Sequence, residues 1–71
     1  MELARTFGRN VRSVRTASGV TLEALAHDVQ LSYSYVGEIE RGRRNPTLAV
    51  VERIAIALNV APLDLLKSRD G

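Results

Sequence analysis

Three side chains between positions 33 and 38 carry groups that can contact the edges of base pairs. The Ser34 hydroxyl can donate or accept a hydrogen bond, the Tyr33 ring can meet a thymine methyl group, and the Glu38 carboxylate can accept from a cytosine amino group. Two alternatives stay open, because Tyr33 can instead cover a helix N-terminus and Glu38 can be a solvated charge that phosphates repel. The base-contacting chemistry requires a helix that presents these residues to the floor of a major groove.

The segment 21–42, TLEALAHDVQLSYSYVGEIERG, has the pattern of two short helices joined by a tight turn. Its apolar residues recur at intervals of three and four on both sides of a break at Gln30 and Leu31. Thr21 and Ser32 are suitable N-caps, which predicts helices over about 21–29 and 32–41. This is a helix-turn-helix pattern. The exposed positions early in its second helix are expected to be Tyr33, Ser34, Gly37 and Glu38.

A basic cluster follows the second helix of this pattern, at Arg41, Arg43 and Arg44. The net charge is only +2, so bulk charge does not by itself indicate a nucleic-acid partner. Nine of the ten cations, however, are arginine, whose planar fork suits bidentate contact with phosphate. A solvated basic loop is the alternative, but the position directly after a helix-turn-helix favours phosphate contact.

The rest of the chain predicts three more helices and no strand, so the expected fold is all-α, a compact five-helix domain over residues 1–71. An apolar stripe predicts a helix over 3–17, which Gly19 closes as a left-handed cap, as Gly42 closes the third helix. Thr47 caps a helix over about 47–59, Pro62 opens a short fifth helix, and the tail 67–71 is expected to fray. The expected buried stripes are Leu3, Phe7, Val11 and Val14 in the first helix, and Leu48, Val51, Ile54, Ala55 and Leu58 in the fourth.

The composition gives little support to catalysis, metal binding or membrane insertion. The chain has no cysteine and a single histidine, His27, so neither a disulfide framework nor a metal site is expected. His27 and Asp28 are adjacent and point about 100° apart in a helix, which prevents a catalytic triad. We therefore expect no enzyme activity, no cofactor and no small-molecule ligand. No apolar run approaches ~20 residues and the N-terminus lacks a signal core, which fits a cytoplasmic protein.

The run from Arg12 to about Leu66 resembles the lambda-repressor-like or Xre-type helix-turn-helix family. The matching residues are Arg15, Gly19, Thr21, Leu25, Ala26, Ser32, Tyr35, Ile39, Glu40, Gly42, Asn45, Pro46, Thr47 and Leu48. The size is similar to that of controller proteins of restriction-modification systems, a narrower likeness that rests on length. The resemblance implies a sequence-specific transcriptional regulator that binds double-stranded DNA, with its recognition helix, about 32–41, in the major groove.

The resemblance also implies roles for residues beyond the base-contacting set. The implied phosphate contacts are Thr21, Tyr35, Arg41, Arg43 and Asn45. Arg15 and Glu40 are implied to form a largely buried ion pair that orients the recognition helix, with two independent surface charges as the alternative. Tyr33 and Leu22 depart from the family, which often has Gln or Arg at the first position and Gln at the second. Bidentate recognition of guanine by an arginine at position 33 is therefore not available.

The two closing helices carry more aliphatic residues than one buried stripe needs, which predicts a homodimer. The surplus residues are Val50, Ile56, Val60, Leu63 and Leu66. Ile56, Leu63 and Leu66 are the predicted interface, and the dimer would bind two half-sites about one helical turn apart. A compact five-helix domain that buries all of the surplus is the alternative.

A second class of function is a protein-interaction module or antitoxin that uses the same fold, with DNA contact secondary. Leu22, Tyr33 and Glu38 support this class, because each weakens the polar face expected of a DNA-binding helix. The salt dependence of duplex binding separates the two classes, since phosphate contacts release counterions.

Overall fold

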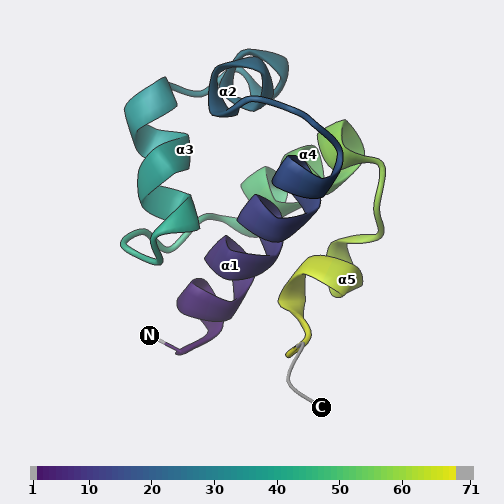
Figure 1. The fold of residues 1–71 in the computed structure, drawn as a ribbon. Helices are drawn as coiled ribbons and strands as arrows, with labels where there is room; N and C mark the ends of the chain where they lie inside the picture. The colour runs from purple at the N-terminus through teal and green to yellow at the C-terminus, as the bar shows by residue number, and fades with distance from the viewer. Residues whose placement is uncertain (1, 69–71) are drawn as a thin grey trace.

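The chain folds into five helices joined by short connections (Figure 1). The structure is a computed structural model that describes residues 2–68. The helices are α1 Glu2–Ala17, α2 Leu22–Val29, α3 Tyr33–Glu40, α4 Leu48–Leu58 and α5 Pro62–Leu66. No strand occurs between residues 2 and 68, so the all-α prediction is confirmed. Of the tail expected to fray, residues 69–71 lie outside the described residues, and Lys67 has the extended backbone of a chain that has left the helix.

Hydroxyl side chains begin three of the helices, as the sequence predicts. The Oγ atoms of Thr21, Ser32 and Thr47 each accept from the backbone N–H three residues later, at 3.0, 3.0 and 3.2 Å. Each bond satisfies a donor that the first turn of a helix leaves unpaired. These local contacts fix where α2, α3 and α4 begin.

Left-handed residues follow the first four helices. Gly19 and Gly42 have φ angles of 73° and 75°, as predicted for caps, and Gln30 and Asn59 both have φ of 60°. At each position the next residue donates its backbone N–H to the carbonyl five residues before it, which is the Schellman arrangement. The turn between α2 and α3 therefore uses a residue with a side chain, Gln30, where glycine is the usual choice.

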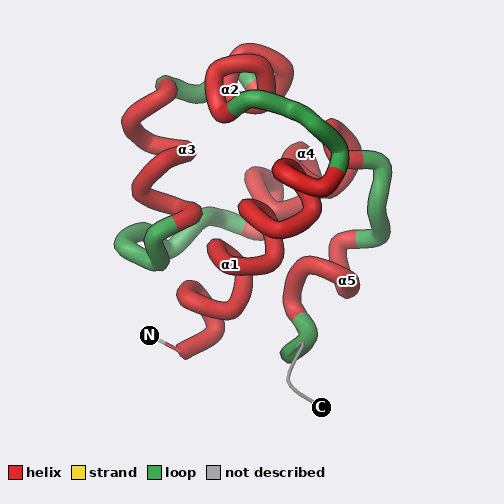
Figure 2. The backbone as a smooth tube through the Cα atoms, viewed as in Figure 1, coloured by secondary structure: helices red, strands yellow, loops and turns green. Residues whose placement is uncertain are grey.

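The hydrophobic core is one cluster of buried side chains drawn from all five helices, whose arrangement Figure 2 shows. The helix α1 packs against α3, α4 and α5, while α2 packs against α3 and α4. Each helix contributes at least one side chain that is almost completely buried. These residues are Phe7, Val11, Leu25, Val36, Ile39, Ile54 and Leu65.

The backbones of α1 and α3 come almost into contact at Gly8. A Cβ atom at this position would lie 2.3 Å from the carbonyl oxygen of Ile39 and 2.7 Å from that of Glu40. Because both neighbours are backbone atoms, only glycine permits this approach. Gly8 therefore sets the distance between α1 and the C-terminal end of α3.

Burial differs from the sequence prediction at several positions. The prediction that Leu3 and Leu48 are buried is wrong, because these residues are 50% and 83% exposed and line an open groove between the first turns of α1 and α4. The prediction that Gly37 is exposed is also wrong: it is buried, and a Cβ there would lie 3.5 Å from the Leu22 side chain of α2. Val50, assigned to the aliphatic surplus, belongs to the core.

Two polar side chains donate hydrogen bonds to backbone carbonyls at the ends of other helices. The sequence pattern predicted neither contact. Asn10 is only 2% exposed, and its Nδ2 atom donates to the carbonyls of Leu65 and Lys67, both at 2.9 Å. Arg53 of α4 donates to the carbonyl of Val29, the last residue of α2. Both side chains satisfy carbonyls that a helix end leaves without an internal partner.

Candidate nucleic-acid interface

The first turn of α3 exposes two of the residues predicted to contact bases. Tyr33 is 57% exposed and Ser34 is exposed, directly after the N-cap Ser32. Leu22, on the neighbouring α2, is half-buried and packs against the core, as its departure from the family pattern suggested. The outward face at the start of α3 is therefore formed by Tyr33 and Ser34.

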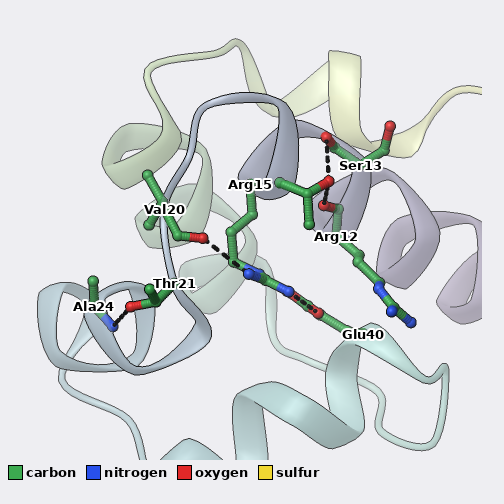
Figure 3. A network of polar contacts seen from close by, with 8 residues as sticks. Arg12, Ser13, Arg15, Val20, Thr21, Ala24 and Glu40 are labelled. Carbon is green, nitrogen blue, oxygen red and sulfur yellow. Dashed lines mark hydrogen bonds and ion pairs between the residues drawn. The ribbon is translucent and has the colours of Figure 1, made fainter.

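Arg15 and Glu40 form the expected ion pair between α1 and the end of α3 (Figure 3). Arg15 Nε donates to Glu40 Oε2 at 2.6 Å, and Nη2 donates to Oε1 at 3.0 Å. The two side chains are 12% and 6% exposed, so the alternative of two independent surface charges is wrong. The hydrogen bond to Glu40 raises the pKa of Arg15 above its usual value, which keeps the guanidinium charged.

A third contact extends this pair to the connection before α2. Arg15 Nη1 donates to the carbonyl of Val20 at 2.9 Å, one residue before the N-cap Thr21 (Figure 3). One guanidinium therefore holds α1, the start of α2 and the end of α3 in a fixed relation. Bidentate pairing of this kind constrains direction as well as distance.

Glu38, the third candidate for base contact, has a partner that sequence spacing did not suggest. Its Oε1 atom accepts from Arg44 Nε at 2.7 Å, and the Arg44 guanidinium carbon lies 5.6 Å from the centroid of the Tyr35 ring. The hydrogen bond from Arg44 lowers the pKa of Glu38, and the charges of Arg41 and Arg43 act in the same direction. We call these residues, Tyr35, Glu38 and Arg44, the arginine clasp. Glu38 is thus neither fully free for base contact nor simply solvated.

The residues predicted to contact phosphate lie at the start of α2, within α3, where Tyr35 is half-buried, and in the connection after α3. Thr21 begins α2, whereas Arg41, Arg43 and Asn45 lie in the connection after α3 and are exposed. Figure 1 shows α3 running from α2 towards this connection, so the elements that carry Thr21 and the exposed arginines adjoin the two ends of α3. Within residues 2–68, Arg41 and Arg43 have no ion pair, in contrast to their neighbour Arg44. Both arginines therefore remain available to an external anion.

The three residues predicted at a dimer interface differ in exposure. Ile56 of α4 and Leu63 of α5 are 72% and 71% exposed. Leu66 is half-buried, packs against the core and lines the same groove as Leu3 and Leu48. The alternative that the domain buries its entire aliphatic surplus is therefore wrong, while Leu66 is partly used by its own chain.

Other kinds of site find no support in the described part of the chain. Among residues 2–68, no group of three or more His, Cys, Asp or Glu side chains is arranged to hold a metal ion. His27 is on the surface, with its side chain 91% exposed and Nδ1 3.9 Å from Asp28 Oδ1. In the same range, no helix has the length and apolar character needed to cross a membrane.

Comparison with known protein families identifies the family of this chain. Residues 6–67 match the family described as a helix-turn-helix domain. The chain belongs to this family. The match includes α2, α3 and the arginine clasp, and it extends over most of α1 and all of α5.

Relatives of this helix-turn-helix domain include the class that its size suggested. The control protein C.BamHI of Bacillus amyloliquefaciens is 44% identical over 61 residues, covering 84% of this chain and 75% of that protein. The crystal structure of the restriction-modification controller protein C.AhdI from Aeromonas hydrophila superposes with a TM-score of 0.86 and 40% identity, covering 92% of this chain and 98% of that one. The biofilm regulator SinR, solved in complex with DNA, has a TM-score of 0.80 and 29% identity, covering 86% and 98%. The resemblance inferred from the sequence is confirmed.

Proposed function

We propose that this protein is a sequence-specific transcriptional regulator that binds double-stranded DNA through α3 and acts as a homodimer on paired half-sites. The observation that most directly supports this proposal is the Arg15–Glu40 ion pair, which links α1 to the end of α3. At the first turn of α3, Tyr33 and Ser34 are exposed. Membership of the helix-turn-helix family and the fold shared with SinR, which was solved with DNA, support the same conclusion. The proposal includes a cytoplasmic location, because a regulator of this kind acts on the genome. It assigns the chain no catalytic role.

In this proposal α3 lies in the major groove and separates base contacts from phosphate contacts. Tyr33, Ser34 and Glu38 contact base edges. The phosphate contacts are Thr21, Tyr35, Arg41, Arg43 and Asn45. The phosphate contacts hold α3 in register on the duplex, and the base contacts supply the sequence preference.

The exposed aliphatic residues of α4 and α5 supply the proposed dimer interface. Ile56 and Leu63 are large apolar side chains that the monomer leaves in water, and Leu66 adds a half-buried edge. Burying each exposed residue stabilises an interface by roughly 1.5–3 kcal/mol. A dimer of this kind presents two copies of α3 to two half-sites, and tethering strengthens the binding of each.

A titration with random-sequence duplex at two salt concentrations tests the proposal. Arg41 and Arg43, which have no ion pair within residues 2–68, give four phosphate contacts in the dimer, and hence a slope of about −3.6 in a plot of log K against log salt. Binding should weaken about a hundredfold between about 50 and 200 mM salt. No binding at low salt would instead favour the alternative, a protein-interaction module or antitoxin with this fold.

A further inference from the structure

In the arginine clasp, the Glu38 carboxylate of α3 pairs with one cation of the basic connection, Arg44. In the cluster at 41–44, the Arg44 guanidinium contacts two side chains of α3: its Nε atom lies 2.7 Å from Glu38 Oε1, and its central carbon lies 5.6 Å from the centroid of the Tyr35 ring. The backbone supports this placement. The N–H of Arg43 donates to the carbonyl of Glu38 at 2.9 Å, which folds the connection back onto α3 just before Arg44.

We propose that Glu38 acts as an internal substitute for phosphate that withholds Arg44 from the DNA backbone and so limits sequence-independent binding. A carboxylate and a phosphate compete for the same guanidinium donors, because both accept hydrogen bonds from the arginine fork. This inference rests on the proposed DNA-binding function.

The charges around Arg44 explain why its guanidinium does not simply leave Glu38 and bind a DNA phosphate. Moving the guanidinium to a phosphate would leave the Glu38 carboxylate unpaired beside the negatively charged backbone. The attraction gained by Arg44 would then be offset by the repulsion of Glu38. Arg43, one residue earlier and free of such a pair in the described chain, has no such penalty. Adjacent arginines in one connection are therefore expected to make unequal contributions to binding.

The clasp leaves Glu38 able to take part in recognition. Arg44 occupies Oε1, while no contact to Oε2 is found within residues 2–68, so Oε2 can still accept from a cytosine amino group. The pair thus suppresses binding to any duplex and keeps the acceptor that a particular sequence needs. Glu38 and Arg44 together are specificity-determining residues.

Salt titrations of four variants with random-sequence duplex test the inference. Random duplex offers no favoured base, so changes there report phosphate contact alone. Glu38→Gln keeps the size of the side chain but releases Arg44, and two added contacts in the dimer should steepen the slope by about 1.8. The gain in affinity over wild type should be about tenfold larger at about 50 mM than at about 200 mM salt. Glu38→Gln with Arg44→Ala should return the slope to the wild-type value.

The matched pair of single arginine variants completes the test. Arg43→Ala should make the slope shallower by about 1.8, and Arg44→Ala by less than half of that amount. Circular dichroism checks that all the variants keep their helices. An Arg44→Ala slope as shallow as that of Arg43→Ala, or a Glu38→Gln slope equal to wild type, would overturn the inference while leaving the DNA-binding function standing. A wild type that binds no duplex would remove the function and the inference together.

Discussion

Replacing Arg15 with alanine would leave a nearly buried carboxylate without its partner. The Glu40 side chain is 6% exposed, and Arg15 supplies both of its charged hydrogen bonds as well as the donor to the Val20 carbonyl. Stranding one member of a buried pair lowers the free energy of unfolding by about 3–5 kcal/mol. A domain of this length has a total of about 4–11 kcal/mol. Arg15→Ala is therefore expected to lower the melting temperature by roughly 12–40 °C.

Thermal unfolding followed by circular dichroism measures this loss, and the protein contains its own control. Arg44 and Glu38 form an ion pair of similar length, 2.7 Å, but with side chains 53% and 32% exposed. Exposed pairs contribute little to stability, so Arg44→Ala should leave the melting temperature almost unchanged. A double variant, Arg15→Met with Glu40→Leu, should recover much of the loss, because no charge remains buried. Equal shifts for Arg15→Ala and Arg44→Ala would refute the reasoning that burial decides the effect.

Four further variants test the packing and the proposed assembly. Gly8→Ala should lower the free energy of unfolding by about 1–3 kcal/mol in urea titrations, because its Cβ would meet the Ile39 carbonyl. The control is Gly37→Ala, whose Cβ would have its nearest contacts at 3.4 and 3.5 Å and which should be neutral or stabilising. Equal free energies of unfolding for the two variants would contradict this reasoning. Asn10→Leu should deprive the carbonyls of Leu65 and Lys67 of their donor and speed hydrogen exchange in α5, and unchanged exchange would show that α5 is held by its apolar contacts alone. Leu63→Glu should split the dimer in sedimentation while helicity survives, since Leu63 is exposed in the monomer; a variant that still sediments as a dimer would move the interface elsewhere.

Local chemistry made much of this fold predictable from the sequence. The caps at Thr21, Ser32 and Thr47 depend on contacts within three residues, and the glycine caps at Gly19 and Gly42 depend on backbone conformation alone. Apolar spacing likewise located the buried faces of α2 and α3. It misassigned Leu3 and Leu48, because periodicity identifies a helix face but not whether a neighbouring helix extends far enough to cover it.

The remaining features depend on contacts between distant parts of the chain, which no local pattern reveals. Asn10 contacts carbonyls more than fifty residues away. Gly8 matters only because α3 passes against it. The clasp between Glu38 and Arg44 spans six residues across the turn at Gly42, a spacing with no helical rule behind it. A glycine inside the helical pattern of residues 3–17 was the available signal for Gly8, since such a residue often marks close packing.

Sequence preference in binding is the most direct test of the central claim, that α3 reads DNA. Sites selected from a random duplex pool would be compared with random duplex at one salt concentration, for wild type and for Ser34→Ala. The account predicts that wild type binds the selected site at least about a thousandfold more tightly, and that Ser34→Ala loses preference at one base position by a factor of about ten. Equal binding to selected and random duplex would contradict it, and an unchanged preference in Ser34→Ala would remove that residue from the contact surface.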